Sequence, residues 1–357
     1  MALLEIDDLQ TRYRTEDGRD VHAVDSVTLE LHDNETLGLV GESGCGKTTL
    51  AKSLIKLLPK NGRIAGGEVR FNGENIAEYS KRDMRRKIRW TEISMIPQSA
   101  MNALDPVHTV GAQIVQAIRI HEDGVSKQEA RQRAKELFER LGLEPERIDD
   151  YPHQFSGGMA QRGMIALALA VNPSIILADE PTTALDVVIQ DRIMNMIQDL
   201  QDEIDSSMIL ITHDMSVVSE TADRIAVMYG GRAVEVADAE TIIDDPRHPY
   251  ALGLRNAFPD ISKKDQNLIS IPGSPPGLID PKEGCKFAPR CPFAVEECWE
   301  RTPEPREFEE GHLVECHRAD EKELLQAEAS KRETWVDDVA EEAPVEESGV
   351  TEGVSDD

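Results

Sequence analysis

The stretch Gly41-Glu42-Ser43-Gly44-Cys45-Gly46-Lys47-Thr48 decides the fold, because it matches the phosphate-binding pattern G-x-x-x-x-G-K-[ST]. A short apolar run at 36–40 precedes it and predicts a buried strand, and residues 47–58 after it predict a helix. In this context the glycines let successive backbone N–H groups turn toward phosphate oxygens, and the helix N-terminus adds positive potential. The sequence therefore predicts a binding site for a nucleoside triphosphate.

Individual residues of this loop are expected to have different roles in binding MgATP. Lys47 is long enough to reach the terminal phosphates of ATP, and the Thr48 hydroxyl can bind Mg²⁺. The residues predicted to contact ATP in this region are Gly41, Ser43, Gly44, Cys45, Gly46, Lys47, Thr48 and Thr49.

Length and charge restrict the class of protein. The 357 residues suffice for one large domain with an appendage or for two domains, and no apolar run approaches the roughly 18 residues that a membrane span requires. The N-terminus is acidic and lacks the basic region of a secretion signal, so we expect a cytoplasmic protein. With 39 Lys and Arg against 68 Asp and Glu, the net charge is −29, which disfavours nucleic acid as a partner.

The acidic residues are spread along the whole chain. We interpret them as the solvated surface of a halophilic protein, in a very salty cytoplasm where screening shortens the reach of self-repulsion. An acidic surface that serves one partner is the alternative.

The pattern along the chain predicts an α/β fold with an added C-terminal part. The first 35 residues partly alternate and predict antiparallel strands, whereas residues 80–170 are largely helical in pattern. Short apolar runs at 175–178 and 208–212 suit a buried parallel sheet. We expect a nucleotide-binding domain over 1–245, a loop-rich module over 246–320 where prolines recur, and an acidic, disordered tail over 321–357.

Two carboxylates follow the apolar run at 175–178. Asp179 and Glu180 would lie at the C-terminal tip of that strand, beside the phosphate loop. Asp179 is suited to hold Mg²⁺, directly or through water, and Glu180 to polarise the attacking water. A strand end with two solvated acids is the plain alternative.

A second anion site is predicted at Ser156-Gly157-Gly158, which opens a helix of about 159–170. Free N–H groups, a hydroxyl and the positive helix end would together attract phosphate. Ser-Gly-Gly alone is common in turns, but its place just before the Asp-Glu strand strengthens the interpretation.

Taken together, these motifs resemble the ATPase subunits of ATP-binding cassette transporters over residues 1 to about 245. Ser156-Gly157-Gly158 is similar to the family signature, although Met159 stands where the signature usually has Gln. The remaining matches are Gln98 for the Q-loop, Ala184-Leu185-Asp186 for the D-loop, His213 for the switch histidine, and Tyr13 for the aromatic residue that stacks on adenine.

The resemblance implies a P-loop cassette with a RecA-like mixed sheet core, an antiparallel β-subdomain and a helical subdomain at about 80–170. It also implies a head-to-tail dimer, in which the signature and Asp186 of one subunit close over ATP held by the other. His213 would contact the γ-phosphate, and Gln98 would sense Mg²⁺ and the attacking water. For Tyr13, a buried aromatic of the β-subdomain is an equal alternative.

Further segments resemble the dipeptide, oligopeptide and nickel importer branch of that family. They are the stretch 103–111 after Gln98, His248-Pro249-Tyr250, Ile271–Pro276, and Gly284–Cys291. This likeness implies two transmembrane permeases, a second ATPase that is a paralogue or a copy of this chain, and an extracellular substrate-binding protein. The chain would then work at the cytoplasmic face of the membrane, with peptides as the default cargo and nickel or oligosaccharides as alternatives.

Four cysteines crowd together near the C-terminus with the spacing C-x5-C-x6-C-x17-C: Cys285, Cys291, Cys298 and Cys316. A reducing cytoplasm disfavours disulfides, and four thiolates among prolines suit a metal that orders a small module. Zinc sites usually show closer pairs. The importer branch includes members with a [4Fe–4S] cluster on such a quartet, so we expect that cluster, with Zn²⁺ and free thiols as alternatives.

Other users of this cassette fit less well. DNA-repair and chromosome-organising ATPases carry a long coiled coil between phosphate loop and signature, but about 108 residues separate Lys47 from Ser156 here. Translation factors carry two cassettes, and the sequence has one phosphate loop. A regulatory ATPase without a transport role remains a further alternative.

Overall fold

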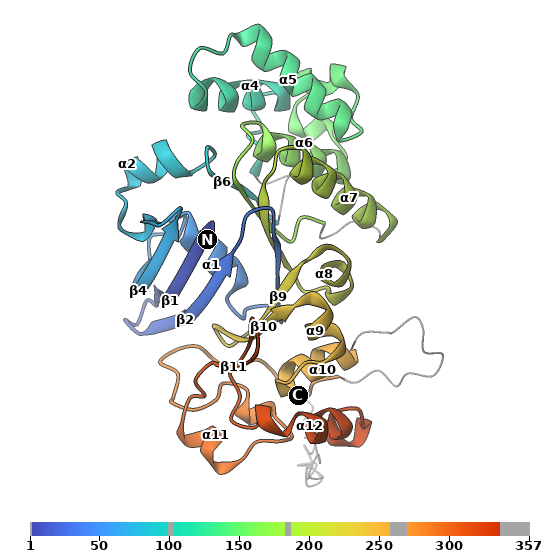
Figure 1. Ribbon diagram of the computed structural model, residues 1–357. Helices are drawn as coiled ribbons and strands as arrows, with labels where there is room; N and C mark the ends of the chain where they lie inside the picture. Colours follow the sequence, from blue (N-terminus) through green and yellow to red (C-terminus); the bar gives the residue numbers. More distant parts are fainter. Residues whose placement is uncertain (1, 99–102, 183–186, 258–269, 336–357) are drawn as a thin grey trace, which may run out of the picture.

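A computed structural model of the protein describes residues 2–98, 103–182, 187–257 and 270–335, without side-chain detail for 187–189 (Figure 1). Over these residues the chain forms a four-stranded and an eight-stranded sheet. The four-stranded sheet lies at the left of Figure 1, the long helices of the middle of the chain lie at the top, and the C-terminal segments lie at the bottom.

The four-stranded sheet has the order β2-β1-β4-β5 and is antiparallel. Strands β1 and β2 pair from Leu4↔Leu31 to Arg14↔Asp20, and Gly18 allows the tight connection with its φ of 86°. The predicted antiparallel strands of the first 35 residues are thus confirmed. The bounds are β1 Leu4–Arg14, β2 Asp20–Leu31, β4 Gly62–Phe71 and β5 Glu74–Asn75.

The eight-stranded sheet has the order β11-β12-β10-β9-β3-β8-β7-β6. The five strands from β9 to β6 run parallel, and β10, β12 and β11 continue the sheet in antiparallel fashion. The bounds of the parallel strands are β3 Thr36–Val40, β6 Ile93–Ile96, β7 Ile175–Asp179, β8 Ser207–Thr212 and β9 Arg224–Tyr229.

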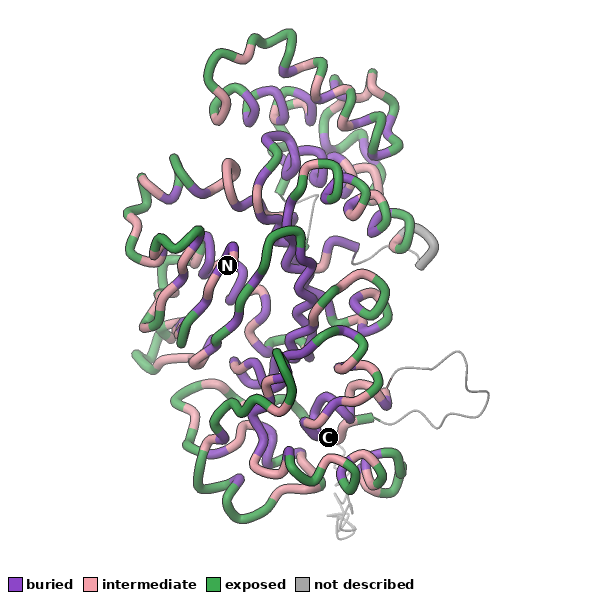
Figure 2. Tube along the Cα trace, viewed as in Figure 1, coloured by how far each residue is buried: buried purple, intermediate pink, exposed green. Residues whose placement is uncertain are grey.

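The centre of this sheet is the core of the molecule. Every residue of β3, β7 and β8 is buried, as expected for parallel strands that helices cover on both faces. The buried residues form the continuous dark band through the middle of Figure 2. The phosphate loop leaves β3, so it starts from the fully buried centre of this sheet.

The helices that flank the core begin with the sequence signals expected of them. Ser126 and Glu129 make both hydrogen bonds of the predicted capping box at the start of α5. The bounds of the longer helices are α1 Lys47–Leu54, α4 Val110–His121, α5 Lys127–Arg140, α6 Gly157–Leu169, α7 Val187–Glu203, α8 Met215–Thr221, α9 Ala239–Asp244 and α10 Pro249–Ala257. Shorter segments are η1 Ile76–Glu78, α2 Lys81–Asp83, η2 Met84–Ile88, η3 Pro145–Asp149 and η4 Pro152–Gln154.

Two segments differ from the sequence predictions. Helix α1 ends at Leu54 rather than near residue 58, since Lys56 adopts a left-handed φ of 51° and Pro59 follows. The interval 80–170 is not helical throughout, because β6 within it pairs with β7 in the core sheet.

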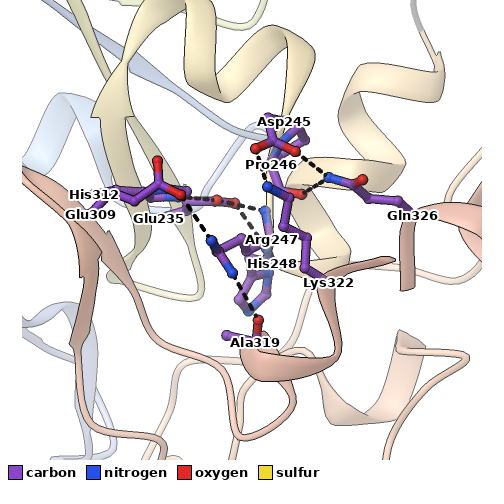
Figure 3. A network of polar contacts seen from close by, with 10 residues as sticks. All are labelled: Glu235, Asp245, Pro246, Arg247, His248, Glu309, His312, Ala319, Lys322 and Gln326. Carbon is purple, nitrogen blue, oxygen red and sulfur yellow. Dashed lines mark hydrogen bonds and ion pairs between the residues drawn. The ribbon is translucent and has the colours of Figure 1, made fainter. Parts of the chain in front are cut away.

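The C-terminal segments pack onto the cassette and join its sheet. Strand β12 (His312–Val314) pairs with β10 (Arg232–Asp238), and β11 (Arg306–Glu309) pairs with β12. Figure 3 shows the polar contacts at this junction, where Glu235 of β10 is completely buried. The other segments are η5 Ala288–Arg290, α11 Glu296–Glu300, η6 Ala319–Glu321, α12 Lys322–Ala329 and η7 Arg332–Trp335.

The prediction of a disordered tail over 321–357 is wrong for residues 321–335, which are ordered and largely helical. Helix α12 packs on α10, and Leu325, Ala329 and Trp335 are buried. These apolar side chains outweigh the acidic composition that suggested disorder. The rest of that tail, 336–357, lies outside the described residues. In the part of the chain that the structure covers, no helix combines the length and the apolar character needed to cross a membrane.

Candidate nucleotide-binding site

The predicted site residues gather where four neighbouring parallel strands end. Strands β3, β8, β7 and β6 lie side by side, so their carboxyl ends share one edge of the sheet. These ends lead into the phosphate loop after β3, His213 after β8, Asp179-Glu180 at the end of β7, and Gln98 after β6. The topology thus brings together motifs that lie far apart in the sequence.

The phosphate loop requires glycine where other backbone groups approach closely. A side chain on Gly41, at φ 149°, would lie 2.2 Å from the Met228 carbonyl oxygen, and one on Gly46, at φ 114°, would lie 2.3 Å from the Ala23 carbonyl oxygen. Gly46 also stands at the N-terminus of α1, so the loop ends at a positive helix end. The local sequence therefore sets a compact turn that ends at the positive N-terminus of α1.

Lys47 is buried beneath this loop. Its ammonium donates hydrogen bonds to the carbonyl oxygens of Gly41 at 2.6 Å and Glu42 at 3.0 Å. The loop carbonyls thus hold the cation at the predicted phosphate site, which is a local positive charge in a strongly acidic chain.

The two predicted Mg²⁺ ligands from the loop and from β7 are in direct contact. The Thr48 hydroxyl donates a hydrogen bond of 2.8 Å to Asp179 Oδ1. Burial raises the pKa of Asp179, and the hydrogen bond from Thr48 offsets part of that rise. A hydroxyl and a buried carboxylate at hydrogen-bond distance are oxygen ligands of the type that Mg²⁺ prefers.

Glu180 lies between the two other polar residues of this edge. Its Oε2 accepts a 2.7 Å hydrogen bond from the Gln98 amide, and its Oε1 lies 3.3 Å from His213 Nδ1. Glu180 also has a left-handed backbone, with a φ of 48° that is uncommon for a residue with a side chain. Such strain is often stored at functional positions. The carboxylate is thus fixed from both sides at the edge of the sheet.

Tyr13 stands at the end of β1 beside the loop helix. Its hydroxyl lies 3.2 Å from the Thr49 hydroxyl, and its half-buried ring packs against Gly62. The structure therefore brings Tyr13 to the neighbourhood of the phosphate loop, while the stacking of its ring on adenine stays a prediction.

The second predicted anion site lies apart from the first, on the helical part of the chain. Ser156 caps α6 by accepting the Met159 N–H, and both Ser156 and Gly157 are exposed. Helix α6 packs against α4, α5, α7 and β6. Asp186 and the rest of the predicted D-loop at 184–186 lie outside the described residues.

Sequence reasoning missed three residues that meet at the phosphate loop. The Arg290 guanidinium pairs with the Glu42 carboxylate, and the Tyr250 hydroxyl accepts the Glu42 N–H at 2.9 Å. Tyr250 and Arg290 stand in segments that the sequence singled out only for their resemblance to the importer branch. The sequence offered one signal for these contacts, which is the acidic Glu42 inside the phosphate loop. A carboxylate close to a bound polyanion needs a positively charged partner.

The four C-terminal cysteines line one pocket, together with side chains that include His248, Phe287 and Phe293. All four are free thiols. Burial, and to a smaller extent the other three thiols, raises the pKa of Cys291. Burial raises the pKa of Cys316 to about 12, while the Arg318 N–H lowers it somewhat.

These thiols fit a metal group held by cysteines. Buried thiols normally stay neutral, but a bound metal deprotonates them, and N–H groups of the type that faces Cys316 stabilise sulfur charge. Within the described ranges, however, no three His, Cys, Asp or Glu side chains are grouped to hold one metal ion.

The fold and the first of these sites define a nucleoside triphosphatase of the phosphate-loop class. Comparison with known proteins shows which family of this class the chain resembles. Residues 24–183 match the ABC transporter family, and residues 234–298 match the C-terminal region of oligopeptide/dipeptide transporters. Among solved structures, the dimeric ATP-binding cassette MJ0796 in a post-hydrolysis state, bound to ADP and Pi, gives a TM-score of 0.60 at 28% identity, covering 66% of this chain and 98% of that chain.

Curated relatives agree with these matches over most of their length. The chain is 46% identical over 323 residues to the probable peptide ABC transporter ATP-binding protein y4tR of Sinorhizobium fredii, covering 89% of this chain and 96% of the relative. It is 41% identical over 319 residues to the dipeptide transport ATP-binding protein DppD of Escherichia coli, covering 89% and 97%. The chain belongs to the ABC transporter ATP-binding proteins of the dipeptide/oligopeptide importer family. It is thus an ABC ATPase, which hydrolyses ATP to drive transport.

Proposed function

We propose that this chain powers the import of dipeptides or oligopeptides across the cell membrane, with MgATP held between two facing cassettes. The observation that carries the proposal is the meeting of Thr48, Asp179, Glu180, Gln98 and His213 at one edge of the sheet. A metal site, a carboxylate base and two polar groups that orient it are what phosphoryl transfer to water needs.

Each residue has a role that follows from its contacts. Thr48 and Asp179 would hold Mg²⁺, because their oxygens already lie 2.8 Å apart. Glu180 would accept the proton of the attacking water, and its contacts with Gln98 and His213 would orient it. His213 is mostly exposed, with 36% of its side chain covered, so it is free to reach a γ-phosphate. Gln98 would report the presence of Mg²⁺ and water to the segment that follows it.

The second cassette is supported by the exposed signature. A side chain on Gly157 would meet nothing within 4 Å, and its φ is not in the left-handed region. Nothing within the described chain therefore requires glycine there. Close approach of a phosphate group from a partner would require it, since a Cβ would hold the α6 N–H groups away. Asp186 would belong to the same interface.

The assembly would contain two membrane permeases, a second ATPase that is a paralogue or a copy of this chain, and an extracellular substrate-binding protein. The likeness of the C-terminal region to that of oligopeptide/dipeptide transporters supports this partnership. The chain would bind the permeases at the cytoplasmic face. Peptides are the favoured cargo because the relatives are named for peptide transport, with nickel or oligosaccharides as alternatives.

The test of the ATP cycle uses the variant E180Q. Loss of the base should lower ATP hydrolysis by roughly a hundredfold or more, while MgATP still binds. Light scattering should then show an ATP-dependent dimer that persists, formed by two copies of this chain or by this chain and a paralogous cassette. E240Q, which removes an exposed charge on α9, should behave as wild type. Unchanged hydrolysis in E180Q, or no closure with either partner, would overturn the proposal.

The cargo needs a separate test, because the ATPase does not touch it. The substrate-binding protein that serves this importer should bind short peptides in calorimetric titrations. Specific binding of nickel or an oligosaccharide instead would refute the cargo and leave the ATP cycle in place.

For the cysteine quartet we favour a [4Fe–4S] cluster over Zn²⁺. The four thiols share one pocket, and four cysteine thiolates are the usual ligands of such a cluster, whereas Zn²⁺ sites usually show closer Cys pairs in the sequence. Cys285, Cys291, Cys298 and Cys316 would hold it, and its contribution would be structural, as a staple for a small module.

Anaerobic purification tests this assignment. The protein should be brown and should contain iron and acid-labile sulfide, and both should be lost in C291S. One zinc per chain without sulfide would establish the alternative.

A further inference from the structure

Two C-terminal segments contact Glu42, the second residue of the phosphate loop, and a third holds the arginine that pairs with it. Tyr250, at the start of α10, accepts the Glu42 N–H through its hydroxyl at 2.9 Å. Arg290 of η5 donates to both Glu42 carboxylate oxygens, at 2.6 and 2.9 Å. The segment that begins at Ile271 supplies backbone carbonyls to the same arginine. The C-terminal region is therefore in direct contact with the predicted ATP site.

The Arg290 guanidinium is fully committed at this position. Besides Glu42, it donates to the Tyr229 hydroxyl at 3.2 Å and to the carbonyl oxygens of Pro272 at 2.7 Å and Ile271 at 3.3 Å. These contacts use all five N–H groups that an arginine has. The side chain is 6% exposed, so its charge is held in place rather than solvated. A lysine could not reproduce this set of contacts.

Glu42 presents an electrostatic problem that this arrangement solves. A carboxylate in a phosphate loop would repel the triphosphate that the loop binds, in a chain that already carries a net charge of −29. The bidentate pair with Arg290 neutralises it and fixes its direction. The backbone is affected too, because the Glu42 carbonyl oxygen accepts a hydrogen bond from Lys47.

We propose that Arg290 is a positioning residue for ATP binding, which reaches from the C-terminal region into the phosphate loop and neutralises Glu42 where the triphosphate is held. This inference rests on the proposed ATP site. It gives the C-terminal segments a role in the ATPase cycle of their own chain, in addition to any contact with other subunits.

A double-mutant cycle tests the pairing on the full chain, purified anaerobically and titrated with MgATP at one fixed salt concentration. R290M should raise the Kd for MgATP about tenfold or more, because it leaves the Glu42 charge uncompensated. E42Q removes that charge, so R290M should change the Kd less than about threefold in the E42Q background. R301M is the matched control, since the Arg301 side chain is 73% exposed, follows the end of α11, and pairs with the exposed Glu297 of that helix. It should match wild type.

The outcomes separate this inference from the proposed site. Equal Kd values for wild type and K47A would refute the phosphate-loop site itself. If K47A binds MgATP more weakly than wild type but R290M binds it as tightly as wild type, only the role of Arg290 is overturned. A lowered melting temperature without a change in Kd would likewise overturn it, because the role would then be purely structural. If R290M does not fold, R290Q, which also removes the positive charge, replaces it in the same cycle, and Kd effects of R290Q and E42Q that simply add would refute the pairing.

Discussion

Glu235 offers a sharp test of how the C-terminal region is attached. Its carboxylate is completely buried in β10 (Figure 3). Oε1 accepts the Arg247 N–H at 2.7 Å and lies 2.8 Å from His312 Nε2, and Oε2 accepts the His248 N–H at 2.9 Å. One side chain thus holds together strand β10, the turn before α10, and strand β12. We expect E235Q to weaken this junction.

The size of the effect follows from the contacts. Gln has one acceptor oxygen, so it can keep the two hydrogen bonds at the Oε1 position but must place its NH₂ group against the His248 N–H. One buried donor then loses its partner and faces another donor, which costs about 1–3 kcal/mol. With an unfolding entropy of about 2.1 cal/mol/K per residue, each kcal/mol corresponds to about 1.3 °C of melting temperature for a chain of this length, so Tm should fall by roughly 1–4 °C.

Differential scanning calorimetry measures this change. The control is E240Q, which removes the same charge from an exposed position on the next helix and so corrects for relief of acidic repulsion. A Tm of E235Q within about 0.5 °C of that of E240Q would mean that water or a local shift satisfies the His248 N–H. The argument from burial at this junction would then be wrong.

Three other predictions concern coupling, pH and salt. Q98A should bind MgATP with a Kd within about threefold of wild type, because the phosphate loop is intact. It should lose most transport in vesicles that hold the whole importer, because the contact of Gln98 with Glu180 is lost. Full transport by Q98A would refute this coupling role. Burial lowers the pKa of His248 to about 3. Between pH 6.5 and 3 the unfolded chain therefore binds more protons than the folded chain. As the pH is lowered through this range, the free energy of unfolding should decrease by up to about 1.4 kcal/mol per pH unit. Urea unfolding of H248N, whose amide oxygen can accept the Tyr250 N–H, should lack that part of the slope; an equal slope would contradict the assignment. The melting temperature should rise with molar KCl, as screening relieves repulsion among the acids, whereas a flat or falling curve would oppose a halophilic surface.

The nucleotide edge could be predicted from the sequence because each part of it is local. The phosphate loop, Asp179-Glu180 and His213 each follow an apolar run of four or five residues, a length that favours a buried strand over a helix. Parallel order then brings all carboxyl ends to one side, whatever the details of packing. What the motifs could not supply was the contact of Glu180 with Gln98 and His213, which depends on the neighbouring order of β6, β7 and β8.

The contacts of the C-terminal region could not be predicted in this way. Arg290 and Glu42 stand 248 positions apart, and neither belongs to a pattern that names the other. Glu235 sits in an ordinary strand, where an acid would normally be assigned to the solvent face. Its burial depends on β12 pairing with β10, and β12 is only three residues long. Pairing of this kind is decided by tertiary packing, to which local propensity is a weak guide.

The same contacts argue that the C-terminal region is part of the ATPase rather than an attachment to it. A separable module would leave the edge of the cassette sheet complete without it, but here β12 and β11 extend that sheet beyond β10. It would also leave no buried charge at the junction, whereas Glu235 and Arg290 are both buried and have their partners across it. Removing one partner of a buried pair costs more than forming the pair gains. The region and the phosphate loop are therefore expected to fold, and to bind ATP, as one unit.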